Sequence, residues 1–132
     1  MIALDTNVLL RFITGDEPVV AAAVRRFLQQ QQAPLFISTV VLIEMVWTLQ
    51  KRYKFSRASL VATLTTLLRH PQVYFSDKPL LQRTLADYSA GNADFADYFI
   101  RNDAQQQGAS PLYTLDKTAA AEQGFVALPL VS

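Results

Sequence analysis

Short apolar runs alternate with longer segments of helical periodicity along the chain. The apolar runs are bounded by proline, glycine or small polar residues, as strands are. They lie at Ile2–Leu4, Leu35–Ile37, Val73–Phe75, Leu112–Leu115 and Phe125–Leu128. Strands that alternate with helices indicate crossover connections and parallel pairing. The pattern therefore predicts an α/β fold, a three-layer α/β/α arrangement around a central, mostly parallel, five-stranded sheet.

The helical segments are separated by residues that cap or break helices. The predicted helices cover Asn7–Ile13 before Gly15, a segment capped by Asp16 and running to about Gln31, Val40–Arg52 capped by Ser38 or Thr39, a segment capped by Ser56 and running to Arg69, a segment capped by Ser76 or Asp77 and ended by Gly91, a segment from Asn92 or Ala93 to Gly108, and Thr118–Gln123. No internal repeat or linker is visible. A single domain over residues 1–132 is therefore expected.

The composition excludes several classes of function. The chain has 132 residues, 51% of them apolar, which is enough for one sizeable core. The formal net charge is only +1, so any nucleic-acid binding must come from a local patch. The chain has no cysteine, which rules out disulfides and thiol catalysis, and its one histidine, His70, precedes a proline at an expected helix end. The apolar run at the N-terminus stops at Asp5, too short for a signal or a membrane span, so a cytoplasmic location is expected.

The most informative feature is a set of carboxylates placed among apolar residues. A carboxylate in apolar surroundings is costly unless something pairs with it, and a divalent cation would serve several at once. The set contains Asp5 in IALDTNVLL, Glu44 in VVLIEMVW, Asp94 and Asp97 in ADFADYFI, and Asp116 in LYTLDK. The other acids, namely Asp16, Glu17, Asp77, Asp87, Asp103 and Glu122, resemble helix caps or solvated surface.

The positions of these acids suit a site in an α/β sheet. Asp5 and Asp116 each follow a predicted strand, and ligands of open parallel sheets bind beyond the carboxyl ends of the strands. Asp94 and Asp97 are three residues apart, on one face of a helix. Glu44 lies in the middle of an apolar helix. The pattern indicates metal-assisted chemistry on phosphate.

Each acid also has a structural explanation. Asp5 and Asp116 are placed to cap helices or turns, Asp94 lies in the first turn of its helix, where the helix dipole favours a carboxylate, and Asp97 is placed to pair with Arg101 one helical turn later. Glu44 is explained as an exposed helix position paired with a base. Independent structural explanations for all five are less economical than one shared cation.

Neighbouring polar and basic residues extend the candidate site. Thr6, Asn7 and Thr114 lie next to the acids and are placed to orient carboxylates or metal-bound water, or simply to cap turns. The segment from Lys51 to Arg57 supplies four bases and two aromatic residues in seven positions. Such a segment suits contacts with RNA phosphates and stacked bases, and its alternative is a solvated turn with core aromatics. The candidate RNA-binding residues are Arg11, Lys51, Arg52, Lys54 and Arg57.

The motifs that contain these acids resemble those of PIN-domain ribonucleases, specifically the VapC-type toxins of bacterial toxin–antitoxin pairs. The resemblance covers essentially the whole chain. Four segments carry it: LDTNVLLR at Leu4–Arg11, STVVLIEMVWTL around Glu44, GNADFADYFI at Gly91–Ile100 and TLD at Thr114–Asp116. Leu115 stands where the family usually has an aromatic residue, and the acid that follows it is retained.

The resemblance implies an activity, a cofactor and partners. It implies a metal-dependent endoribonuclease that uses Mg²⁺ or Mn²⁺ and hydrolyses RNA phosphodiester bonds. Asp5, Glu44, Asp97 and Asp116 match the four acidic positions of the family, and Asp94 matches a further acid common in this subgroup. It also implies a cognate VapB-like antitoxin whose segment fills the active-site groove, and a homodimer. The apolar helices Val40–Leu49 and Leu60–Leu68 are candidate surfaces for these partners, although burial in the core also explains them.

Other classes fit less well. A haloacid-dehalogenase-type phosphatase needs a second aspartate two residues after the first, where this chain has Asn7. A phosphoacceptor receiver domain needs acids in the first strand region and a lysine after the last strand, and Met1–Leu4 and Phe125–Ser132 supply neither. Within the PIN family, a housekeeping RNA-processing nuclease and a non-catalytic RNA-binding relative stay open.

Overall fold

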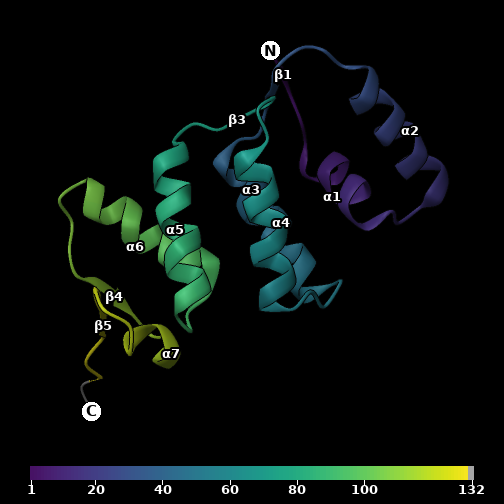
Figure 1. The fold of residues 1–132 in the computed structure, drawn as a ribbon. Coiled ribbons are helices and arrows are strands. Elements are labelled where there is room, and N and C mark those ends of the chain that lie inside the picture. Colours follow the sequence, from purple (N-terminus) through teal and green to yellow (C-terminus); the bar gives the residue numbers. More distant parts are fainter. Residues whose placement is uncertain (131–132) are drawn as a thin grey trace. The chain divides into compact units, whose positions relative to one another are not determined.

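The computed structural model describes residues 1–130 and contains, over that range, seven helices and five strands (Figure 1). The chain divides into two compact units, one formed by Met1–Ser76 and the other beginning at Asp77. Each unit is built from parallel strands connected by helices.

The first unit is a three-stranded parallel sheet with four helices. Its strands β1 (Ile2–Ala3), β2 (Leu35–Phe36) and β3 (Val73–Tyr74) pair in the order β1-β2-β3. Two further backbone hydrogen bonds, from Leu4 to Phe36 and from Ile37 to Tyr74, continue the sheet just past the strands. The helices are α1 (Thr6–Thr14), α2 (Pro18–Gln30), α3 (Thr39–Lys51) and α4 (Arg57–Arg69).

The core of the first unit forms where α3 and α4 pack near the sheet. Leu42, Met45 and Leu49 of α3 are fully buried, as is Leu64 of α4. These residues recur at intervals of three and four, so one stripe of α3 faces the core while Glu44 lies outside it. Burial of this stripe explains most of the apolar character of both helices.

The second unit contains three helices and a two-stranded parallel sheet. Its helices are α5 (Lys78–Ala90), α6 (Phe95–Gln106) and α7 (Lys117–Ala120), and its strands β4 (Leu112–Thr114) and β5 (Phe125–Ala127) pair with each other. Tyr88 of α5 packs edge-to-face on Phe95 of α6, with ring centroids 5.7 Å apart. Between the same helices, the buried amide of Asn102 donates to the hydroxyl of Thr84.

The predicted α/β class with parallel strands is confirmed, and all five predicted strands are present, hydrogen-bonded as a group of three and a group of two. Each strand is one residue shorter than predicted. The caps predicted at Ser38, Ser56 and Asp77 accept backbone hydrogen bonds as expected. The single domain predicted for residues 1–132 stays a prediction.

Several helix boundaries differ from the prediction. Asp16 does not cap α2, because Glu17 occupies the N-cap position in a left-handed conformation (φ 53°). Helix α6 begins only at Phe95, after Asp94, and α7 ends at Ala120 rather than near Gln123. Over the described residues, no helix combines the length and apolar character needed to cross a bilayer.

Candidate functional site

In the first unit, Asp5 and Glu44 are connected through Thr6. Asp5 is the N-cap of α1, and its Oδ1 accepts the backbone N–H of Thr6 at 2.7 Å. The hydroxyl of Thr6, which is buried, donates to Oε1 of Glu44 on α3 at 3.4 Å, a long and weak hydrogen bond. Thr6 therefore contacts both carboxylates, that of Asp5 after β1 and that of Glu44 on α3. Asn7, the other polar residue predicted here, is exposed in the first turn of α1.

In the second unit, Asp94 and Asp97 begin helix α6 together. Asp94 is the N-cap and Asp97 is the third residue of the helix, and the two form a capping box. The backbone N–H of Asp94 donates to Oδ2 of Asp97 at 3.3 Å. Both carboxylates interact favourably with the N-terminus of α6, so both are held close to each other there.

Asp116 occupies the same kind of position at helix α7. Its Oδ1 accepts the backbone N–H of Ala119 at 3.0 Å, so it caps the helix. Its own backbone N–H donates to the hydroxyl of Thr114 at 3.0 Å. Thr114, predicted as a supporting residue, thus fixes the turn that presents Asp116.

The three carboxylates of the second unit influence one another. Partial burial raises the pKa of Asp97, and the negative charges of Asp94 and Asp116 raise it further, while the hydrogen bond from the Asp94 N–H opposes the shift. Because two neighbouring charges disfavour the ionised form of Asp97, a bound cation would relieve the repulsion.

The expectation that apolar neighbours bury the acids is wrong. Asp5, Glu44, Asp94 and Asp116 are exposed, and only Asp97 is half-buried. The apolar neighbours of Glu44, such as Met45 and Val46, turn into the core while the carboxylate points away from it. Sequence adjacency does not mean spatial adjacency on a helix.

The donor chemistry of these residues fits Mg²⁺ or Mn²⁺, since carboxylate oxygens are hard ligands. Among residues 1–130, no three acidic or histidine side chains lie close enough to form a ready-made cation cage. Mg²⁺ commonly binds through one or two carboxylates and keeps several waters, so fewer protein ligands are compatible with it.

Arg101 does not pair with Asp97. Its guanidinium forms an ion pair with Asp87 of α5 and donates to the backbone carbonyl of Gln123. It also stacks over the rings of Tyr98 and Phe125, at 5.0 and 5.4 Å from their centroids. The structural alternative for Asp97, a pair with Arg101 one helical turn later, is therefore not found, because Arg101 binds these tertiary partners instead.

The basic segment between α3 and α4 is only partly exposed. Lys51, Arg52 and Lys54 are exposed, whereas Arg57 is half-buried and has an interaction of its own. Tyr53 donates its hydroxyl to Oδ2 of Asp16 at 2.7 Å, so its ring is held by the turn before α2. Three cations of the segment are therefore available to a nucleic acid.

Arg11 differs from the other predicted RNA-binding residues because it already has an anionic partner. Its guanidinium lies 2.6 Å from the carboxylate of Glu17, and its side chain is only 15% exposed. The hydrogen bond with Glu17 raises the pKa of Arg11. To bind RNA, Arg11 would have to exchange this partner.

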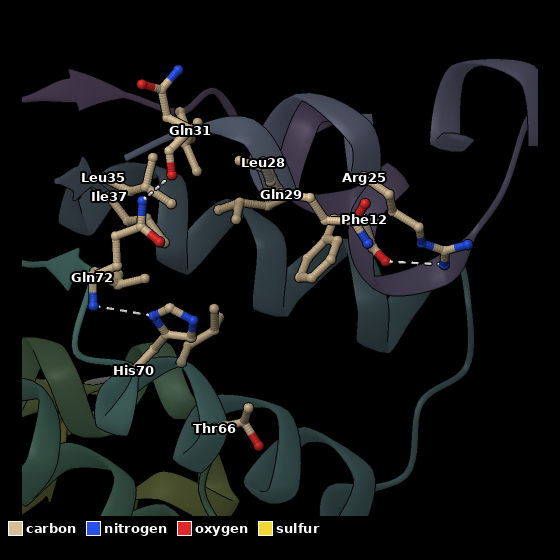
Figure 2. Close-up of a pocket in the computed structure, with 14 residues that line it drawn as sticks. Phe12, Arg25, Leu28, Gln29, Gln31, Leu35, Ile37, Thr66, His70 and Gln72 are labelled. Atoms are coloured by element: carbon tan, nitrogen blue, oxygen red, sulfur yellow. Dashed lines mark hydrogen bonds between the residues drawn. The ribbon is translucent and has the colours of Figure 1, made fainter. Parts of the chain in front are cut away.

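The first unit also has an apolar groove that the sequence does not reveal (Figure 2). It has a volume of about 470 Å³, and Leu9, Leu28, Leu35, Ile37 and Leu67 contribute to its apolar lining. Arg25 and His70 are the ionisable residues among those that line it, and no carboxylate does. The groove therefore suits an apolar ligand with acidic flanks.

Glu122 is a residue whose role the sequence does not reveal. Its carboxylate accepts the backbone N–H of Asn92 at 2.6 Å and the hydroxyl of Tyr98. The sequence predicts solvated surface at Glu122, because no local pattern links it to the turn that carries Asp94. Its partners lie 30 and 24 residues away, a separation that periodicity does not report.

Comparison with known proteins defines the class. The PIN domain profile matches residues 2–122, a range that includes all five candidate acids and extends over both units. The chain belongs to the PIN-domain family.

Within that family, the relatives include a VapC ribonuclease, as the motifs predict. The chain is 31% identical over 107 residues to the VapC ribonuclease of Aquifex aeolicus (strain VF5), an overlap of 80% of this chain and 79% of the relative. The crystal structure of Mycobacterium tuberculosis VapC20, described as a toxin that cleaves the sarcin–ricin loop, matches 92% of this chain and 94% of its own. That match has 20% sequence identity and a TM-score of 0.44.

The link between Asp16 and Tyr53 predicts a pH-dependent contribution to stability. The hydrogen bond from Tyr53 lowers the pKa of Asp16, assisted by the Glu17 N–H and the charges of Arg11 and Arg52 and opposed by partial burial. The stabilisation is complete above the ordinary carboxyl pKa of about 3.9 and is lost as the pH falls through the lowered value. We expect the melting temperature of the wild type to exceed that of Asp16→Asn at neutral pH, and the difference to shrink in acid.

Tyr53→Phe provides the control, because it removes the largest cause of the shift and leaves the carboxylate. The difference in melting temperature between Tyr53→Phe and the double variant Asp16→Asn/Tyr53→Phe should depend less on pH than the difference between the wild type and Asp16→Asn. If the melting temperature of the wild type exceeds that of Asp16→Asn by the same amount from about pH 7 to about pH 3, the hydrogen bond from Tyr53 does not lower the pKa of Asp16.

Proposed function

We propose that this protein is a metal-dependent endoribonuclease of the VapC type, with Asp5, Glu44, Asp97 and Asp116 as its metal-binding and catalytic residues and Asp94 as a further ligand. The observation that carries the proposal is the 31% identity to a VapC ribonuclease over four fifths of the chain. The raised pKa of Asp97 beside Asp94 and Asp116 supports it independently, because these carboxylates favour a cation.

The residues of the chain supply binding and orientation. When bound, Mg²⁺ or Mn²⁺ supplies an activated water and stabilises negative charge on the phosphate. Thr6 orients the carboxylates of Asp5 and Glu44, and Thr114 fixes the turn of Asp116. Asn7 follows Thr6 in the first turn of α1. The chemistry requires neither cysteine nor histidine, consistent with a chain that has no cysteine and a single histidine at the end of α4.

RNA binding is assigned to the exposed cations that follow α3. Lys51, Arg52 and Lys54 present three positive charges within four residues, and Arg52 lies over the ring of Tyr53 at 5.5 Å. Cations of this kind bind phosphates without reading sequence, so they set affinity rather than the choice of cleavage site. Arg57 and Arg11 stay candidates with weaker support, because each already has a partner.

A cognate VapB-like antitoxin and a homodimer are the proposed protein partners in the cytoplasm. Besides the antitoxin segment that fills the active-site groove, we assign a second, apolar segment of the antitoxin, flanked by acidic residues, to the groove between α1, α2 and α4 in Figure 2. The argument is complementarity: the lining is mainly apolar and its ionisable residues are Arg25 and His70. Arg25 is held at the rim by a hydrogen bond to the carbonyl of Phe12 at 3.2 Å.

The central test is cleavage of total RNA by purified, antitoxin-free protein. We expect discrete cleavage in Mg²⁺, none in EDTA, and a loss of at least about 100-fold in rate for Asp97→Asn. Asp103→Asn is the matched control, because Asp103 is an exposed acid of the same helix. Cleavage that survives Asp97→Asn would refute the assignment. No cleavage by folded, metal-binding protein would indicate an RNA-binding relative instead.

The basic segment predicts a change in salt dependence. Neutralising Lys51, Arg52 and Lys54 together as glutamines should reduce the slope of log affinity for single-stranded RNA against log salt by about 2, at about 0.7 per phosphate contact. Binding should be measured by fluorescence anisotropy with Asp97→Asn, which prevents cleavage. A matched variant neutralises three exposed bases elsewhere, Arg26, Arg69 and Lys78, and should keep the wild-type slope. Equal slopes for the two triple variants would contradict the assignment.

The groove predicts a selective effect on antitoxin binding. Arg25→Glu should weaken the affinity for the purified cognate antitoxin by at least about tenfold, because an acidic flank would then meet a like charge. Arg26→Glu makes the same charge change at the neighbouring exposed position, outside the lining of the groove, and should have little effect. RNA cleavage by the free variants should match the wild type. Equal loss of affinity in both variants would indicate a general charge effect and refute the groove.

A further inference from the structure

The turn that carries the acidic pair of α6 is held by side-chain hydrogen bonds. Gly91, Asn92 and Ala93 connect α5 to α6 and lie outside any helix or strand. The N–H of Asn92 donates to Oε1 of Glu122 at 2.6 Å, and the N–H of Ala93 donates to the hydroxyl of Tyr98 at 3.2 Å. The same hydroxyl donates to Oε1 of Glu122. The two residues before Asp94 are therefore anchored by one carboxylate and one phenol.

Tyr98 is itself rigidly placed. Its side chain is 2% exposed and packs edge-to-face on Phe125 of β5, with Arg101 over its other side. Gly91 passes directly beside the phenol. A Cβ at residue 91 would lie 1.8 Å from the Tyr98 hydroxyl and 2.5 Å from Oε1 of Glu122. The turn and its anchor fit together only because residue 91 lacks a side chain.

Glu122 connects this turn to a second acidic position. It lies two residues after the end of α7, and its backbone N–H donates to the carbonyl of Ala119. The N–H of Ala119 in turn donates to Oδ1 of Asp116. One end of the Glu122 residue is thus fixed to the short helix that begins at Asp116. The other end, its carboxylate, holds the turn that leads to Asp94 and Asp97.

We propose that Glu122 and Tyr98 are positioning residues that hold the Asp94–Asp97 turn and the Asp116 turn in the arrangement that binds the metal ion. This inference rests on the proposed function. Mg²⁺ tolerates little deviation from its preferred geometry, so ligands on two different turns must be held rigidly. Residues that orient metal ligands without touching the ion commonly change affinity by about 10–100-fold when they are removed.

Two measurements test the inference, one without metal. The first is amide hydrogen exchange of Asn92 and Ala93 in metal-free protein, and the second is Mn²⁺ affinity by calorimetry. Glu122→Ala should speed exchange of the Asn92 amide and weaken Mn²⁺ binding by at least about tenfold. Tyr98→Phe keeps the ring but removes the hydroxyl, so it should speed exchange of the Ala93 amide and weaken Mn²⁺ binding as well.

Glu122→Gln separates position from charge. It removes the negative charge but keeps the Oε1 acceptor, so it should bind Mn²⁺ more tightly than Glu122→Ala and keep the Asn92 amide protected. Asp103→Ala, which removes an exposed charge from the same unit, should match the wild type in both measurements. If Glu122→Ala and Glu122→Gln lose affinity equally, or if neither amide changes its exchange, the positioning role is refuted.

The same design distinguishes failure of the inference from failure of the proposed function. A wild type that does not bind Mn²⁺ would refute the metal-dependent activity, and with it any role in positioning a metal. The exchange rates of Asn92 and Ala93 would then still show whether Glu122 and Tyr98 hold the turn.

Discussion

Helix N-termini determine where the carboxylates of this protein lie. Asp5, Asp94 and Asp116 are the N-caps of α1, α6 and α7, and Asp97 is the third residue of α6. Each of these helices begins where the chain has just left a strand or a tight turn, and its first N–H groups lack partners within the helix. A carboxylate that satisfies those groups is held in place by the backbone itself. Capping and metal binding are therefore compatible uses of the same side chain.

This arrangement also explains why Asp5, Asp94 and Asp116 are exposed. A capping carboxylate stays exposed to water while its position is fixed by the helix it begins. Repulsion among Asp94, Asp97 and Asp116 then falls mainly on the one that is half-buried, Asp97. The cost of gathering like charges is moderated by solvent at the other positions, and the fold does not need a bound ion to keep them there.

The sequence was sufficient to predict what depends on local pattern. The five strands, the helices between them and the caps at Ser38, Ser56 and Asp77 follow from hydrophobic period and capping residues. Contacts between distant segments could not be predicted from the sequence. Arg101 pairs with Asp87 rather than Asp97, and Asp16 binds Tyr53 rather than capping α2. Glu122 was missed for the same reason. The candidate acids were found because their motifs are local, whereas the residues that support them are not.

The order of the acids along the chain has a consequence for synthesis on the ribosome. Asp5 and Glu44 belong to the compact unit that ends at Ser76, while Asp94, Asp97 and Asp116 follow it. Segments of a nascent chain fold in the order in which they emerge, at about 5–20 residues per second. A chain interrupted after its first unit would carry two of the proposed ligands and lack the others. A fragment of this kind would hold only Asp5 and Glu44, so a site that uses all five acids could form only after synthesis of the second unit.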